Sequence, residues 1–199
     1  MKSLRIAVAL GATLLGASAW AQTGTDFCVP GQNGVTNCPC NNPPAGTGKG
    51  CANFGPSTPG QSATLAASGT ASLSNDTLQF MATGTNDTVL CVFLQGSSSL
   101  GSGLPYGAGL MCIPIGGQHM LYDGNAGTGE PAGQITRPRP GIDPDVHTRS
   151  ATLGDTLTAG VTRFYMVGYR DKNARLTGNC GSSQSTKNST QGVSVVWGP

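Results

Sequence analysis

Seven cysteines in a chain of 199 residues constrain the fold more than any other feature of this sequence. Three of them fall in the segment CPCNNPPAGTGKGC (38–51), which is rich in Pro, Gly and Asn. Zinc sites usually present Cys-x2-Cys turns, and a thioredoxin-like redox centre also needs Cys-x-x-Cys. Cys38 and Cys40 have a single residue between them, so the spacing favours disulfides over a metal or redox site, and we expect no cofactor.

The first 21 residues have the layout of a secretory signal peptide. Lys2 and Arg5 form a basic start, an apolar run covers residues 6–20, and Ala19-Trp20-Ala21 fits a cleavage site after Ala21. The apolar run is too short for an ordinary membrane-spanning helix, and no second long run follows. The sequence therefore predicts a protein that is secreted, periplasmic or displayed on the cell surface, where disulfides persist.

The expected mature chain, residues 22–199, is almost neutral. Removing Lys2 and Arg5 from the eleven basic residues leaves nine, which balance the nine acidic residues. A neutral chain offers no electrostatic attraction for nucleic acid or for an anionic membrane surface. These two classes of partner are therefore not expected, and the mature chain is long enough for one domain with its own core.

An odd number of cysteines leaves at least one unpaired in a monomer. Cys91 lies within TVLCVFLQG, a segment apolar on both faces, where cysteine behaves as a small buried hydrophobe. We therefore expect Cys91 to be the free thiol. Locality favours the pairs Cys28–Cys38, Cys40–Cys51 and Cys112–Cys180, with Cys28–Cys40 and Cys38–Cys51 as a rival for the first two.

Short segments with alternating or continuous apolar residues, separated by Gly, Pro and Asn, predict an all-β fold. The expected strands are 63–69, 77–84, 88–96, 110–114, 118–124, 161–171 and 192–198. Residues 110–114 and 118–124 are expected to form a hairpin around Ile115-Gly116-Gly117. We predict a disulfide-clasped segment at 22–61, followed over 62–199 by a single antiparallel, jelly-roll-like β-sandwich with long loops.

The connection 124–160 holds the one candidate polar site. Asp143, Asp145 and His147 lie close together in GIDPDVHTR, and an Asp/His cluster can bind a metal or orient a base. No Gly-x-Ser-x-Gly nucleophile motif is present, and nothing marks two carboxylates as a glycosidase pair. We therefore expect these three residues to belong to a solvated loop, with no catalytic residues and no metal.

Five segments resemble a group of small exported bacterial β domains that contain cysteines and have no characterised function. They are CPCNN…GKGCAN (38–53), ATLAASGTASLSNDTLQFMATG (63–84), LPYGAGLMCIP (104–114), TRFYMVGYRD (162–171) and TQGVSVVW (190–197). The resemblance implies a secreted β module and no known reaction. The chain departs from the group at Met166 and Gly168, where the group tends to have a polar residue and a large aromatic.

Three functions follow from these observations. The leading one is a non-catalytic exported module with a structural, adhesion or cell-envelope role, whose partner would be a surface polysaccharide or another envelope protein. The second is a carbohydrate-binding module, which would require exposed aromatic side chains in a row on a sheet face. The third is a hydrolase with its site in loop 124–160, which would require His147 against an acid and a serine in a cleft.

Overall fold

The computed structural model describes residues 23–172 and 186–199. The predicted signal peptide, its cleavage site at Ala21, and Cys180 lie outside these ranges. Within them the chain is almost entirely β, its strand pairs are antiparallel, and one short helix interrupts the pattern. The all-β sandwich expected from the sequence is therefore confirmed.

The elements follow one another along the chain in the following order. They are β1 (Thr25–Phe27), β2 (Thr64–Ser68), β3 (Gln79–Thr83), β4 (Leu90–Gly96), β5 (Leu104–Tyr106), β6 (Gly109–Met111), the 3₁₀ turn η1 (Ile115–Gly117), β7 (Gln118–Asn125), β8 (Ile135–Arg137), α1 (Val146–Thr152), β9 (Thr162–Arg170), β10 (Lys187–Ser189) and β11 (Gly192–Val196).

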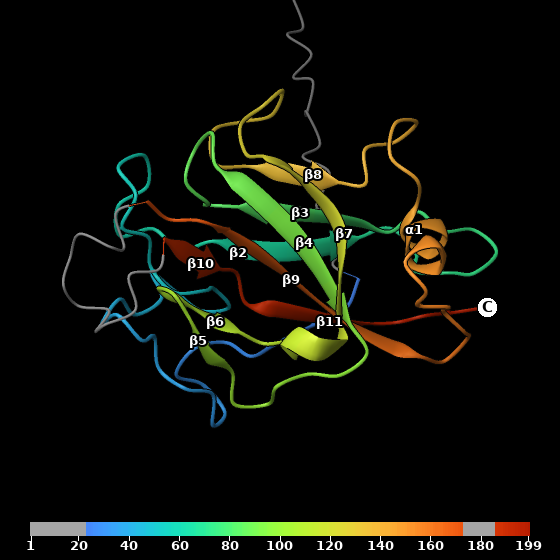
Figure 1. Ribbon diagram of the computed structural model, residues 1–199, viewed down its shortest axis with the longest axis horizontal. Helices are drawn as coiled ribbons and strands as arrows, with labels where there is room; N and C mark the ends of the chain where they lie inside the picture. The colour runs from blue at the N-terminus through green and yellow to red at the C-terminus, as the bar shows by residue number, and fades with distance from the viewer. Residues whose placement is uncertain (1–22, 173–185) are drawn as a thin grey trace, which may run out of the picture.

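The main sheet runs in the order β1-β11-β9-β4-β7, and β10 adds to β9 beside β11 (Figure 1). Strands β4 and β9 are paired on both sides, which agrees with their apolar residues on both faces. The first strand of the described chain pairs with the last, since Thr25 lies opposite Ser194. One edge of the sheet is thus built from β1 and β11, which lie far apart in the sequence.

A second sheet, β2-β3-β8, packs against one face of the main sheet and forms the larger core. Phe80 of β3 meets Tyr165 of β9 with ring centroids 4.4 Å apart. The indole nitrogen of Trp197 donates a hydrogen bond of 3.1 Å to the hydroxyl of Tyr165. Both rings are fully buried, so their polar atoms satisfy each other within the apolar core.

The other face of the main sheet is covered by the β5–β6 hairpin and by the N-terminal segment. Cys28, Leu110, Cys112 and Met166 are buried together in this smaller cluster. The molecule therefore has three layers, with the main sheet in the middle. Alternate residues of β4 and β9 reach the two cores, which explains why neither strand has a polar face.

One detail of the sequence prediction is wrong. Strand β6 pairs with β5, and β7 pairs with β4, so 110–114 and 118–124 form no hairpin. The Gly-Gly pair at 116–117 belongs to a 3₁₀ turn that sends the chain from the outer layer to the main sheet. The long connection 124–160 also contains β8 and α1, which are too short to show a period in the sequence.

Candidate functional site

Asp143 of the predicted polar site is held by an arginine. Its two carboxylate oxygens accept hydrogen bonds of 2.9 Å each from the guanidinium of Arg139, and the backbone nitrogen of Arg139 adds a third at 2.8 Å. This bidentate pairing lowers the pKa of Asp143. Asp143 therefore fixes the turn that follows β8 and stays ionised near neutral pH.

Asp145 and His147 also have structural partners. A side-chain oxygen of Asp145 accepts a 2.7 Å hydrogen bond from the backbone nitrogen of Thr148, so Asp145 is the N-cap of α1. The backbone nitrogen of His147 donates to the carboxylate of Asp76 at 2.8 Å, and its half-buried ring lies 6.3 Å from that of Trp197. Pro144 and Asp145 are exposed, as the sequence predicts, but His147 belongs to α1 and not to a loop.

A cavity of about 360 Å³ lies beside this turn, with Asp76, Arg139 and Asp145 in its lining. Burial raises the pKa of Asp76, although its carboxylate accepts hydrogen bonds from two backbone nitrogens, those of Leu78 and His147. In the described ranges, the His147 imidazole makes no hydrogen bond to a serine or a carboxylate. The nucleophile–base–acid arrangement that the hydrolase hypothesis needs is not assembled here.

The cysteines pair differently from the local prediction. The bonds are Cys28–Cys112 and Cys38–Cys51, which shows that the predicted pairs Cys28–Cys38, Cys40–Cys51 and Cys112–Cys180 are wrong. The pair Cys38–Cys51 belongs to the rival connectivity, but its companion Cys28–Cys40 does not form. Cys40 is disulfide-bonded as well. Locality failed because strand pairing brings the outer hairpin next to the N-terminal segment, a proximity that sequence distance does not show.

Cys91 is unpaired and fully buried between the two sheets. Burial raises the pKa of its thiol to about 11, so the reactive thiolate is almost absent at neutral pH. Its environment is the apolar one that the sequence predicts.

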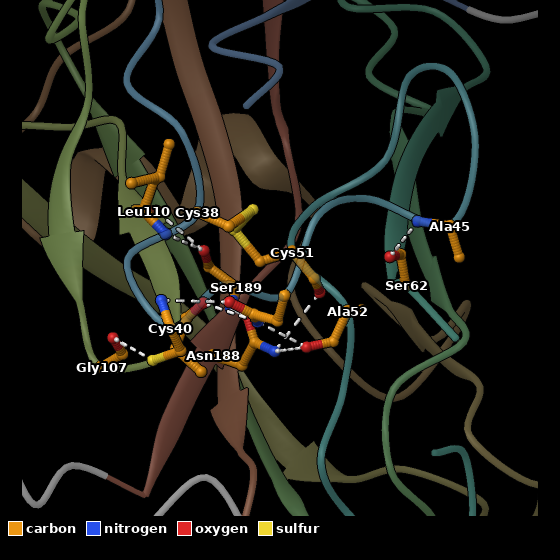
Figure 2. The surroundings of a disulfide bond; sticks show 12 residues. Cys38, Cys40, Ala45, Cys51, Ala52, Ser62, Gly107, Leu110, Asn188 and Ser189 are labelled. Carbon is orange, nitrogen blue, oxygen red and sulfur yellow. Dashed lines mark hydrogen bonds between the residues drawn. A yellow bond between two sulfur atoms is a disulfide. The ribbon is translucent and has the colours of Figure 1, made fainter. Parts of the chain in front are cut away.

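The loop closed by Cys38–Cys51, here called the clasp, is pinned to β10 (Figure 2). The amide of Asn188 donates to the carbonyl oxygens of Cys51 and Ala52 at 3.4 and 3.3 Å. A Cβ atom on Gly50 would lie 2.1 Å from the carbonyl oxygen of Ser189, so only glycine permits this close approach. The clasp is thus an integral part of the domain.

Five buried polar side chains form a hub at the end of β9. The hub consists of Asn53, Asn86, Tyr169, Asp171 and Asn188, none of them more than 3% exposed. The amides of Asn86 and Asn188 donate to the Asp171 carboxylate at 3.3 and 3.2 Å, and the Tyr169 hydroxyl donates to Asn53. The hub ties the segment after the clasp, the β3–β4 loop and the β9–β10 pair to one another.

Asp171 is the acceptor at the centre of the hub. Burial raises its pKa, while hydrogen bonds from the backbone nitrogen of Phe54 (2.9 Å) and from the two asparagine amides oppose that shift. A buried carboxylate is tolerated only when donors surround it. The polar groups of the hub are therefore paired with one another and with the backbone, and they hold these segments together.

Sequence reasoning did not single out the hub, although partial signals were present. Asn53 and Asp171 lie in two of the segments that carry the resemblance, GKGCAN and TRFYMVGYRD. Asn86 and Asn188 look like ordinary turn asparagines in the sequence, yet both are buried. Only the tertiary fold shows that these residues meet.

Within the described residues, the tyrosine and tryptophan side chains do not line up as an exposed row. Among the residues that the structure describes, Tyr106 is half-buried, and Tyr122, Tyr165, Tyr169 and Trp197 are buried. The row of exposed rings that a typical carbohydrate-binding module needs is not present in these ranges. Over the same residues, no cluster of three His, Cys, Asp or Glu side chains is arranged to hold a metal ion.

Comparison with known proteins gives no match. No family model, no curated protein and no solved structure is significantly similar to the chain. The resemblance to exported bacterial β domains therefore stays a prediction. Residues 23–172 and 186–199 include no helix with the length and apolar character needed to span a bilayer.

Proposed function

We propose that this chain is an exported, non-catalytic β-sandwich module that acts in adhesion or in the architecture of the cell envelope. The proposal rests on how the conspicuous polar residues are used. Asp143 holds a turn, Asp145 caps a helix, and Asp171 organises the buried hub. Polar groups with structural partners of this kind stabilise a scaffold.

The disulfides support the same proposal. Bonds between Cys28 and Cys112 and between Cys38 and Cys51 are typical of proteins that mature in an oxidising compartment. Together with the signal-like segment at residues 1–21, they favour export. A sandwich held by disulfides is well suited to withstand the conditions outside the cytoplasm.

The test uses the full chain expressed in a bacterium with an affinity tag after Pro199. The exported form should begin at Gln22 by intact mass, should contain oxidised cysteines, and should co-sediment with envelope or capsule fractions. Retention of residues 1–21 on a cytoplasmic protein would contradict export. Hydrolysis of esters or glycosides that is lost in His147→Ala would contradict the non-catalytic assignment.

A further inference from the structure

A small pocket lies on the outer face of the main sheet, at the end that the β5–β6 hairpin leaves uncovered. Its volume is about 200 Å³. Leu90 and Val92 of β4, Gly168 and Arg170 of β9, and Lys187 of β10 line it, and Tyr106 leans over it from the hairpin. Three adjacent strands thus build the floor, which gives the pocket a rigid base.

Gly168 creates the hollow. It lies opposite Val92 on one side and Ser189 on the other, in the middle of three paired strands. A Cβ atom at this position would lie 3.3 Å from both Cε1 and the hydroxyl oxygen of Tyr106, closer than side chains normally pack. The phenol end of Tyr106 therefore rests over bare backbone. Its hydroxyl makes no hydrogen bond within the described chain, which leaves it available to a ligand.

The rim of the pocket carries two positive charges that face each other. Lys187 and Arg170 are direct cross-strand partners, and both are exposed. Like charges at directly opposed positions of an antiparallel pair destabilise the sheet. The ammonium of Lys187 also lies 5.2 Å from the ring centroid of Tyr106, so both cations border the same hollow.

No acid neutralises this pair within the part of the chain that the structure describes. The ion pairs there use Arg137, Arg139 and Arg163. Arg170 instead donates to the hydroxyl of Thr186 at 2.9 Å. An anion placed between Arg170 and Lys187 would remove their repulsion and gain charge-assisted hydrogen bonds.

We propose that this pocket binds one hexuronic acid residue of an acidic polysaccharide, with the carboxylate between Arg170 and Lys187. The Tyr106 hydroxyl would bond a ring hydroxyl, and an apolar C–H face of the sugar would lie on Leu90 and Val92. The inference deepens the proposed function and rests on it, because it names the substance to which the module adheres.

The size of the pocket favours a single ring. Pockets for drug-sized ligands usually measure about 300–1,000 Å³, so 200 Å³ suits a smaller group. Leu90, Arg170 and Lys187 are exposed at the rim, so the rest of a polymer can continue into solvent on either side. The charge selects an acidic sugar over a neutral one, because a neutral ring would leave the two cations unpaired.

The experiment measures binding of trigalacturonate to the purified, oxidised protein by calorimetry and by NMR titration. Galactotriose and methyl-esterified trigalacturonate are the uncharged controls. Arg170→Gln and Lys187→Gln should each weaken trigalacturonate binding roughly fivefold or more, and added salt should weaken it further. Lys172→Gln removes a positive charge from the neighbouring loop and should leave the affinity unchanged. Tyr106→Phe removes only the hydroxyl and tests its proposed hydrogen bond to a ring hydroxyl of the sugar.

Stability of the variants separates binding from folding. Removing either member of a repelling pair should leave the melting temperature unchanged or raise it slightly, so lost binding cannot be ascribed to unfolding. Equal affinity for the charged and esterified sugars, no binding at millimolar concentration, or preference for inorganic phosphate would overturn the inference. Envelope adhesion that survives in Arg170→Gln and Lys187→Gln would also overturn it while leaving the proposed function intact. Uronate binding by a protein that is not exported would overturn the proposed function and leave the binding inference intact.

Discussion

Asn188 donates a 3.2 Å hydrogen bond to the carboxylate of Asp171, and the same side chain donates to the carbonyl oxygen of Cys51 in the clasp. The same amide lies 3.3 Å from the carbonyl oxygen of Ala52, just beyond the Cys38–Cys51 bond. One asparagine thus connects the buried acid, the disulfide-closed loop and the edge of β9. Perturbing the acid should therefore affect the anchoring of the clasp as well as the sandwich.

Asp171→Asn should destabilise the protein by about 2–3 kcal/mol. The substitution replaces one acceptor oxygen by an amide that faces the donors of Asn86 and Asn188, leaving buried groups unsatisfied. Denaturant unfolding followed by tryptophan fluorescence measures the loss. Lys172→Gln, next in the chain and exposed, is the control and should change stability by less than about 0.5 kcal/mol. If Asp171→Asn left the free energy of unfolding unchanged, the hub would contribute little to stability.

The two described disulfides should differ in their contribution to stability. Cys28–Cys112 spans 84 positions and Cys38–Cys51 spans 13. Chain-entropy estimates give about 4.5 kcal/mol for the longer loop and about 3 kcal/mol for the shorter. We expect the double variant Cys28→Ser/Cys112→Ser to have the lower unfolding free energy. A larger loss in Cys38→Ser/Cys51→Ser would mean that native contacts of the clasp outweigh loop entropy.

Cys91 should react with thiol reagents only after unfolding. It is fully buried, and a pKa of about 11 leaves almost no thiolate at pH 7.5. Thiol counting in buffer and in denaturant, followed by peptide mapping without reduction, locates the reactive residue. Cys91→Ala should keep both described bonds and cost about 1–2 kcal/mol through the small cavity that it leaves. Labelling of Cys28 or Cys112 in the native protein would contradict the observed pairing.

Asp155 should make the protein sensitive to acid. Its carboxylate accepts hydrogen bonds of 2.6 and 2.8 Å from Arg163, which lower its pKa below the unfolded value of about 3.9. The stability gained from this ionised form is fully present above about pH 5 and is lost as the pH falls through the folded pKa.

Asp155→Asn should therefore cost about 2 kcal/mol at pH 7 and much less near pH 2. The measurement is the unfolding free energy of both proteins across this pH range. The matched control is Asp123→Asn, which replaces an exposed carboxylate on β7. Its unfolding free energy should change with pH in the same way as that of the wild type. A difference between Asp155→Asn and wild type that stays constant with pH would argue against the pairing with Arg163.

The strands could be predicted because their residues alternate or remain apolar over five or more positions. Residues 90–96 and 162–170 are clear examples, since each packs into a core on both sides. The strands β1, β5, β8 and β10 have three residues each, which is too short to show a period in the sequence. They are strands because each pairs with a neighbouring strand. The helix α1 is only two turns long and is set by its cap, Asp145.

The candidate sites were less predictable for a related reason. Asp143, Asp145 and His147 were visible as a cluster in sequence, but the structure gives each a separate structural partner. Arg170 and Lys187 lie 17 positions apart and become neighbours only when β9 and β10 pair. The sequence reveals residue types, whereas strand register decides which of them share a face.

The pairing of β1 with β11 determines when this protein can finish folding. Residues 25–27 pair with residues 192–194, so the main sheet cannot be completed until the last strand has been synthesised. The native Cys38–Cys51 bond can form once residue 51 has been synthesised, whereas the native Cys28–Cys112 bond has to wait for residue 112. The order of strands along the chain thus postpones the last step of folding until residues 192–196 are available.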